Sequence, residues 1–450
     1  MKWKAELLTA VSNILKVTLK TGYDDDKSRN YVHLSLWVSG NPQSRRWFVK
    51  MTIAIITGVY PPMIGGAGAV MHSLAVHAPD RIAIVTGEFD SDGNRVSCED
   101  GRLHASENVH RIPRLSRTLR LLPRGRLRAV FQAAYDRLLL HPQTTRNLIR
   151  VLDSLRPEVV CIGTLGSCYW VVDAVRRWRQ GTKVVVYIHG EEIPRGSGYF
   201  NRIRREALQG ASALVAVSSF TKSALIGLGI PPNRIALITN GVDTARFQPG
   251  AKNQRIVERY GLASRRVLLT LARLDERKGQ DMMIKALPMI RKAVPDVMYL
   301  IVGEGTYGGT LRRLVSELHL EETVVFTGAA SDDEVVDFYR TCDVYAMPNR
   351  TLEDGDTEGF GLVFLEAGAC GKPVIGGIAG GAPDAIMHEV TGLLVDGTSA
   401  EAIASTCIRL LQDARLRSEL GANGLTHARD NDWRIKTQEF LAFCDTAVRS

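Results

Sequence analysis

Short apolar runs alternate with helical patterns from residue 52 onward, and this alternation restricts the fold more than any other feature. The first series has six runs, mostly rich in Val and Ile, each followed by Gly, Pro or polar turn residues. Near-continuous apolar strands separated by helices indicate a parallel sheet covered on both faces. The six runs are 52–57, 81–86, 159–163, 183–188, 213–217 and 234–239.

A second series of the same kind begins after a loose charged connector that we expect to end near Arg266. Two doubly wound α/β domains in tandem create a cleft between the carboxyl ends of two sheets, where such sheets bind ligands. We therefore predict an α/β fold with domains at 51–243 and 244–428 and a terminal helix within 429–450. The runs of the second series are 267–271, 297–302, 324–327, 344–347, 373–375 and 392–395.

The first 50 residues do not continue this pattern. They contain lysines, an acidic run at 24–26 and a strand-like stretch at 33–38, but no signal-peptide core with a cleavage site. We interpret them as an appendage or an upstream misreading of the start, with a small extra domain as the alternative.

The bulk composition is that of a soluble globular protein, with 45% hydrophobic and 23% charged residues. A length of 450 residues predicts two or three domains. No window is apolar over the roughly 18 residues that a membrane-spanning helix needs. The seven scattered cysteines form no Cys-x-x-Cys pair, so we expect reduced packing residues in a cytoplasmic protein, without a metal site.

Much of the net charge of +9 is local: residues 111–131 contain seven arginines, interleaved with leucines, and no acidic residue. Such a stretch suits contact with an anionic membrane surface, and a solvated surface whose arginine stems lie on the core is the alternative. Because stacking aromatics are not interleaved, nucleic acid is not expected as a partner. The predicted membrane contacts are Arg114, Arg117, Arg120, Arg124, Arg126 and Arg128.

Two loops carry groups that suit phosphate. Gly65 and Gly66 lie where the first strand turns into a helix, so a phosphate could approach the free backbone N–H groups there. A tight connection is the alternative. Arg273 and Lys278 follow the run 267–271 and could hold a diphosphate from the carboxyl edge of the second sheet. A solvated basic loop is the alternative there.

A Gly-rich loop with Glu358 runs into an apolar helix with Glu366. In a helix, a spacing of eight residues returns to roughly the same side, so a ligand at the helix start could meet both carboxylates. The alternative is an ordinary acidic helix start, favoured by the helix dipole.

Jointly these motifs resemble the retaining GT-B glycosyltransferases of family 4, which include sucrose synthase and bacterial phosphatidylinositol mannosyltransferases. The resemblance covers residues 52–425 and includes the run 358–362 (Glu-Gly-Phe-Gly-Leu) and 240–243 (Asn-Gly-Val-Asp). It implies two Rossmann-like domains that face each other across a cleft. Two departures are Ala272, where the family usually has Gly, and Asp384, where Glu is commoner. The form of the Asp384 turn is most similar to the mannosyltransferase branch and favours GDP-mannose weakly.

The resemblance also implies roles for individual residues. Glu366 would bind the ribose, Glu358 the donor sugar, and His189 would lie near the sugar hydroxyls. Arg273 and Lys278 would neutralise the diphosphate, with the backbone N–H of Gly66 donating to it. Glu358, His189, Arg273 and Lys278 form the predicted catalytic set, and the remaining donor-site residues are Gly65, Gly303, Gly305, Thr327, Gly359, Phe360, Gly361 and Leu362.

The predicted reaction moves a hexose, mannose or glucose-like, from a nucleotide-diphosphate sugar to a lipid-linked or polysaccharide acceptor. Fixed cations that stabilise the departing diphosphate make a metal or other cofactor unnecessary, and the resemblance implies retention at the anomeric carbon. We expect an enzyme at the inner face of the cell membrane. A nucleotide-sugar epimerase or hydrolase, or a non-catalytic nucleotide- or lipid-binding protein, are the alternatives.

Overall fold

The computed structural model describes residues 15–22, 31–38, 52–61, 65–89, 108–113, 141–194 and 198–449. The chain divides into two compact units, Met1–Lys50 and Met51–Ser450. In the first unit, β1 (Leu15–Gly22) pairs antiparallel with β2 (Tyr31–Val38), so the strand expected at 33–38 is present.

The second unit begins with a parallel sheet that has seven strands within the described residues, in the order β5-β4-β3-β6-β7-β8-β9. All six runs predicted for the first domain form strands. The strand that the sequence did not reveal is β5, which lies at the edge of the sheet and has a single buried residue, Ile112. The strands are β3 (Ile53–Ile56), β4 (Ile82–Gly87), β5 (Asn108–Ile112), β6 (Val159–Ile162), β7 (Lys183–Ile188), β8 (Ala213–Ala216) and β9 (Ile235–Leu237).

Helices cover both faces of this sheet, as its continuous apolar strands require. Along β3, Ile53 and Ile55 share one core with Leu74 of α2, whereas Ile56 belongs to a second core with Leu148 of α4. Among the described residues, the helices of this lobe are α2 (Gly66–Val76), α4 (His141–Leu155), α5 (Leu165–Cys168), α6 (Val171–Trp178), α7 (Tyr199–Gly210) and α8 (Ser219–Gly227), with the 3-10 turn η2 (Pro232–Arg234).

The second sheet is also parallel, and all six predicted runs form its strands, in the order β12-β11-β10-β13-β14-β15 within the described residues. They are β10 (Arg266–Leu271), β11 (Val297–Val302), β12 (Val324–Gly328), β13 (Val344–Met347), β14 (Val374–Gly377) and β15 (Gly392–Val395). The elements between and after them are η3 (Glu276–Lys278), α10 (Gln280–Ala293), α11 (Gly308–Glu317), α12 (Asp332–Thr341), α13 (Leu362–Ala369), α14 (Ala382–Ala385), α15 (Ala400–Gln412) and α16 (Ala414–Asp430).

The connector between the lobes is not entirely loose, which corrects the expectation from its charge. It contains α9 (Gln254–Arg259), whose first turn is capped by Asn253. The Asn253 side-chain oxygen accepts the backbone N–H of Arg255 at 2.9 Å and that of Ile256 at 3.3 Å, which satisfies donors that have no partner within the helix.

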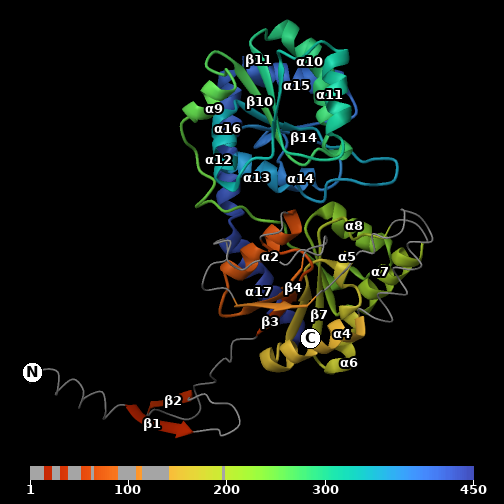
Figure 1. Cartoon of the computed structure of the whole chain (residues 1–450), viewed down its shortest axis with the longest axis vertical. Coiled ribbons are helices and arrows are strands. Elements are labelled where there is room, and N and C mark those ends of the chain that lie inside the picture. Colours follow the sequence, from red (N-terminus) through yellow and green to blue (C-terminus); the bar gives the residue numbers. More distant parts are fainter. Residues whose placement is uncertain are drawn as a thin grey trace, which may run out of the picture. The chain divides into compact units, whose positions relative to one another are not determined.

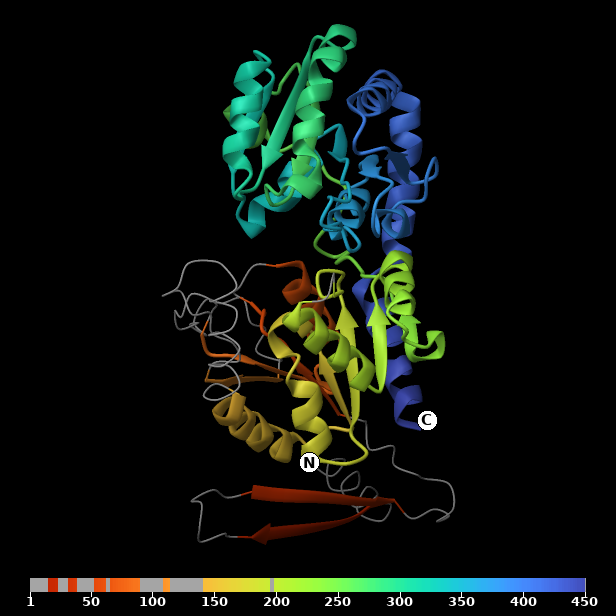
Figure 2. The same cartoon turned by 90° about the vertical axis from the view of Figure 1, so that its right-hand side faces the viewer.

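The last helix, α17 (Trp433–Arg449), returns to the N-terminal lobe (Figures 1 and 2). The chain passes between the lobes twice, near Val242 and near Asn431, and these two segments are hydrogen-bonded to each other. The N–H of Val242 donates to the carbonyl oxygen of Asn431 at 3.0 Å, and the N–H of Trp433 donates to the carbonyl oxygen of Val242 at 3.1 Å. On the N-terminal lobe, the Phe440 ring packs 5.9 Å from the Tyr187 ring. The C-terminal helix therefore ties the end of the chain to the first sheet.

This attachment predicts a large effect of Phe440→Ala on stability. Phe440 is fully buried, so its truncation should cost about 3–5 kcal/mol through lost burial and a residual cavity. Urea denaturation measures the loss. The control Ile435→Ala removes a side chain on the same helix from a residue that is 44% exposed. Similar small losses in both variants would contradict the packing described.

Candidate active site

The predicted site residues leave the carboxyl ends of strands in both sheets. His189 follows β7 directly, and Arg273 follows β10 after one residue. Gly303 follows β11, with Gly328 at the end of β12. Because parallel strands present these ends at one edge, residues far apart in the sequence are brought together there.

Two helix starts approach each other from the two lobes. Leu362, the first residue of α13, places its Cδ1 atom 4.0 Å from the point where a Cβ on Gly66, the first residue of α2, would lie. Backbone N–H groups at a helix start have no partner within the helix and carry partial positive charge. The arrangement therefore suits an anion.

The lobes also meet where two glycine backbones pass each other. A Cβ on Gly359 would stand only 1.8 Å from the carbonyl oxygen of His189, so no side chain fits at position 359. Gly190, on the other side, has a φ of 111°, which side chains rarely tolerate. These glycines allow the His189 loop and the Glu358 loop to touch.

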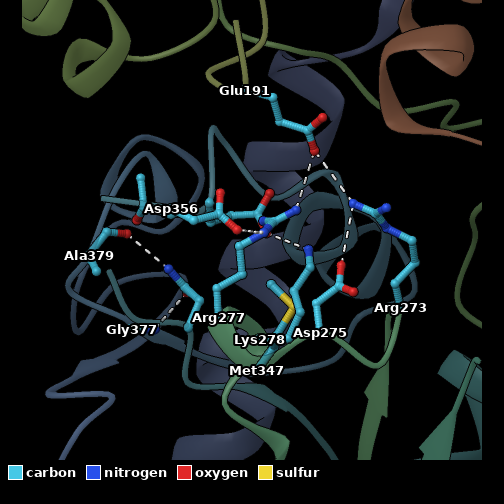
Figure 3. Close-up of polar contacts among 12 residues, drawn as sticks. Glu191, Arg273, Asp275, Arg277, Lys278, Met347, Asp356, Gly377 and Ala379 are labelled. Carbon is cyan, nitrogen blue, oxygen red and sulfur yellow. Dashed lines mark hydrogen bonds and ion pairs between the residues drawn. The ribbon is translucent and has the colours of Figure 1, made fainter. Parts of the chain in front are cut away.

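Arg277 forms the centre of the charged cluster (Figure 3). Its side chain is only 6% exposed, and each of its three guanidinium nitrogens faces a different carboxylate. Nη1 lies 3.0 Å from Glu358, Nε 3.2 Å from Asp356, and Nη2 3.5 Å from Glu191. The sequence did not reveal this role, although Arg277 lies between the predicted residues Arg273 and Lys278.

Glu358 is held ionised by its partners. Besides Arg277, the Nζ of Lys278 donates to the same carboxylate oxygen. Burial opposes ionisation of the carboxyl group, but the positive charges of Lys278 and Arg277 outweigh it and lower the pKa of Glu358 below its ordinary value of 4.5. Lys278, which the sequence predicts as a diphosphate ligand, is thus paired with Glu358 in this structure.

Glu366 has a different environment. It lies on α13, and the hydroxyl group of Tyr339 donates to its Oε2 at 2.7 Å. Burial raises the pKa of Glu366 above 4.5, against the lowering effects of the Tyr339 hydrogen bond and the Arg246 charge. Glu358 precedes the helix, because α13 begins at Leu362. Glu358 thus lies in the loop and Glu366 on the helix, as the sequence indicated, and the spacing of eight residues does not put both carboxylates on one helix face.

Arg273 lies at the edge of a cavity of about 510 Å³. Its side chain is 65% exposed, and its Nη2 lies 3.4 Å from both Glu191 and Asp275. The cavity is lined by Glu191, Arg273, Asp275, Glu276, Arg277, Thr306, Tyr307, Leu352 and Asp356. Several carboxylates and two guanidinium groups thus share one opening.

His189 is fixed by its ring and by its backbone. Its Nε2 lies 2.9 Å from the carbonyl oxygen of Gly163, and because a carbonyl can only accept, Nε2 carries the proton. The ring stacks on Tyr187 with centroids 5.2 Å apart. The backbone N–H groups of His189 and Gly190 donate to the buried carboxylate of Glu192 at 3.0 and 3.1 Å. Burial raises the pKa of Glu192, which the sequence had not singled out.

Three of the other predicted donor residues have packing or hydrogen-bonding roles within the fold. A Cβ on Gly303 would stand 2.1 Å from the Ala272 carbonyl oxygen, so this glycine lets β11 pack against the Arg273 loop. Phe360 is buried, and the hydroxyl group of Thr327 donates to the Gly328 carbonyl at 3.0 Å. Contact of these residues with a nucleotide stays a prediction.

Three more glycines of the predicted donor site lie in loops or at helix starts. A Cβ on Gly305 would stand 2.4 Å from the Leu274 carbonyl oxygen. Gly361 has a φ of 92° at the start of α13, and Gly65 precedes α2 in an exposed position. Their contact with a donor likewise stays a prediction.

The predicted membrane contacts, Arg114, Arg117, Arg120, Arg124, Arg126 and Arg128, lie outside the described residues. Arg111, at the start of the same stretch, donates to the carbonyl oxygens of Pro61 at 2.8 Å and Gly87 at 3.1 Å. In the part of the chain that the structure describes, no helix has the length and apolarity to cross a bilayer. Over the same residues, no three His, Cys, Asp or Glu side chains group as metal ligands would.

Comparison with known proteins identifies the family. Residues 64–246 match Glycosyltransferase Family 4, and residues 253–427 match Glycosyl transferases group 1. The chain belongs to this glycosyltransferase family, as its motifs predicted.

Among similar proteins is the GDP-mannose-dependent alpha-(1-6)-phosphatidylinositol monomannoside mannosyltransferase of Mycolicibacterium smegmatis. It is 37% identical over 308 residues, which are 67% of this chain and 79% of that protein. A GDP-mannose-dependent monoacylated alpha-(1-6)-phosphatidylinositol monomannoside mannosyltransferase of Corynebacterium glutamicum is 29% identical over 84% of this chain and 93% of its own length.

Solved structures share the fold. HepE from Anabaena in complex with UDP superposes with a TM-score of 0.70 at 21% identity and covers 88% of this chain and 100% of its own. Sucrose-phosphate synthase from Thermosynechococcus elongatus gives a TM-score of 0.70 at 20% identity, over 89% of this chain and 100% of its own. The predicted GT-B architecture of two Rossmann-like domains is confirmed.

The two glutamates should affect the pH dependence of stability with opposite signs. The pKa of Glu358 is lowered in the fold, so its ionised form stabilises the fold above the unfolded-state value, and this contribution is lost as the pH falls through the folded-state pKa. The pKa of Glu366 is raised, so its contribution is complete below the unfolded-state value and is lost as the pH rises through the folded-state pKa.

We therefore expect Glu358→Gln to reduce the loss of stability on acidification below pH 4.5, and Glu366→Gln to reduce the loss as the pH rises above 4.5. Urea midpoints measured from about pH 3.5 to 6.5 test this. Identical pH profiles for the two variants would contradict their separate environments.

Proposed function

We propose that this glycosyltransferase is a retaining, metal-independent hexosyltransferase that takes a nucleoside-diphosphate sugar, GDP-mannose first, and glycosylates a lipid-linked polyol. The observation that carries the proposal is the ionised Glu358 with Lys278 and Arg277, in an interlobe cleft where the starts of α2 and α13 approach each other. The names of the relatives support the choice of mannose and of a phosphatidylinositol-based acceptor.

The donor would lie along the carboxyl edge of the second sheet. Lys278 and Arg273 supply positive charge for the diphosphate, and the start of α2 at Gly66 supplies backbone donors. Glu366 accepts ribose hydroxyl groups, and Glu358 accepts hydroxyl groups of the sugar. In this arrangement the two glutamates divide recognition between the nucleoside and the hexose.

Transfer breaks the bond between the anomeric carbon and the phosphate oxygen. Negative charge grows on the diphosphate while positive charge grows on the sugar ring, and fixed cations stabilise the former. The acceptor hydroxyl oxygen forms the new bond on the same face, and its proton passes to the leaving phosphate oxygen. Charge balance then needs no metal, because Lys278 and Arg273 perform the electrostatic task that a metal ion performs elsewhere.

A double displacement through Glu358 is disfavoured by its partners. The ion pairs with Lys278 and Arg277 lower the pKa of the Glu358 carboxyl group, and a less basic carboxylate is a weaker nucleophile toward carbon. The backbone of His189 touches the same loop at Gly359, and the Nε2 of its ring is already bonded to Gly163. Its other ring nitrogen, Nδ1, remains as an acceptor for a sugar hydroxyl.

We extend the proposal to location. The arginine- and leucine-rich sequence 111–131 would bring the enzyme to an anionic membrane surface at the cytoplasmic side, where a lipid-linked acceptor is displayed. Vesicle flotation tests this extension: with Arg117, Arg120, Arg124 and Arg126 changed to Glu, binding to anionic vesicles should be lost. Unchanged binding would refute the membrane contact.

The division between the two glutamates predicts distinct kinetic effects. Glu366→Gln should weaken GDP binding by about tenfold, because a charge-assisted hydrogen bond to ribose is lost. Glu358→Gln should lower kcat by about a hundredfold with a smaller effect on GDP affinity. Calorimetry and steady-state rates with GDP-mannose measure both. Glu419→Gln, at an exposed position on α16, is the control. Equal loss of GDP affinity in both variants would show that the roles are divided wrongly.

The reaction type has its own test. Purified enzyme with GDP-mannose and a phosphatidylinositol-type acceptor should give a product with the donor's anomeric configuration, by proton NMR, at an unchanged rate in EDTA. Inverted configuration, or loss of activity on chelation, would contradict retention or metal independence respectively. Rapid epimerisation of GDP-mannose in the absence of an acceptor would contradict the transferase proposal and favour a nucleotide-sugar epimerase.

A further inference from the structure

Glu191 joins the two lobes through a single carboxylate oxygen. It belongs to the loop that follows β7 in the N-terminal lobe, two residues after His189. Its Oε1 lies 3.4 Å from Nη2 of Arg273 and 3.5 Å from Nη2 of Arg277, both in the C-terminal lobe (Figure 3). One oxygen anion therefore bridges two guanidinium groups.

Of the three carboxylates on Arg277, Glu191 is the one most readily exchanged. Its side chain is 67% exposed, compared with 34% for Asp356 and 12% for Glu358. Asp356 and Glu358 also belong to the same lobe as Arg277, whereas Glu191 does not. Loss of Glu191 would leave Arg277 with two carboxylate partners, so its buried charge would stay compensated.

The neighbouring carboxylate has a different task. Glu192 is buried and accepts the backbone N–H groups of His189 and Gly190, so it holds the His189 loop in place. Glu191 makes no such backbone bond among the contacts of the described residues. Its carboxylate can therefore leave the arginines without releasing His189.

We propose that Glu191 is an internal anion that occupies the Arg273–Arg277 pair when no donor is bound, and that the donor diphosphate displaces it. This inference rests on the proposed function, because it takes a diphosphate as the competing ligand. A phosphate oxygen and a carboxylate oxygen seek the same guanidinium N–H groups, so they compete for this position. Glu191 thereby weakens donor and product binding and makes release of the nucleoside diphosphate easier.

The opposite role predicts the opposite result. If Glu191 instead accepted hydroxyl groups of the bound sugar, its removal would weaken the binding of GDP-mannose and leave GDP unaffected. The sign of the change in affinity therefore separates an internal competitor from a sugar contact.

The test is calorimetric titration of wild-type protein and Glu191→Gln with GDP and with inorganic pyrophosphate. The amide keeps the size of the side chain and removes its charge, so both ligands should bind up to about fivefold more tightly, the upper limit set by exposed ion pairs. Stronger product inhibition by GDP should accompany this. Glu353→Gln removes the same charge from an exposed turn of the Asp356 loop and should leave both affinities unchanged.

Each outcome has a distinct meaning. Unchanged or weaker binding of GDP and pyrophosphate to folded Glu191→Gln overturns the inference. An equal gain in affinity in Glu353→Gln would show a general effect of charge, and this result also overturns the inference. Wild-type protein that binds neither GDP, UDP nor pyrophosphate refutes the proposed function, and the inference fails with it. A wild-type protein that binds GDP, with no gain in Glu191→Gln, refutes the inference alone.

Discussion

The buried guanidinium group of Arg277 is the interaction on which the site depends. A charge removed from water is costly unless it is paired and hydrogen-bonded, and Arg277 is paired by Asp356, Glu358 and Glu191. Two of these carboxylates belong to the loop before α13, and the third, Glu191, belongs to the other lobe. The ion pairs of Arg277 thus hold η3, the loop before α13 and the loop after β7 next to one another.

The parallel sheets explain why these loops meet at all. Each loop leaves the carboxyl end of a strand, and glycines at 190 and 359 allow the backbones of the two lobes to touch. The approach of the α2 and α13 starts adds backbone donors to the cations. The chemistry proposed for this cleft needs positive charge held in place around a leaving diphosphate. The fold fixes Arg273, Arg277 and Lys278 there by pairing them with carboxylates.

The sheets were predictable because parallel strands that are buried on both faces have nearly continuous apolar sequences. All six runs of each series form strands, and the family motifs identified the edge that carries Glu358, Glu366, Arg273 and Lys278. The edge strand β5 was missed because most of its residues are polar, and all but one are at least partly exposed. The helix α9 was missed because its charged sequence resembles a linker.

The partners within the site could not be read from the sequence. An arginine that is solvated and one that is buried among carboxylates look alike in sequence, so Arg277 was overlooked beside its neighbours. The spacing of Glu358 and Glu366 did not reveal their separate environments, because α13 begins at Leu362 and Glu358 lies in the loop before it. Glu191 and Tyr339 gain their roles only from tertiary contacts with residues more than twenty positions away.

A crystal structure of the protein with bound GDP tests the central claim most directly. The account predicts a diphosphate within hydrogen-bonding distance of Lys278 Nζ and the backbone N–H of Gly66, with the ribose hydroxyl groups on Glu366. A nucleotide bound elsewhere, or one whose diphosphate contacts neither Lys278 nor the start of α2, would contradict it.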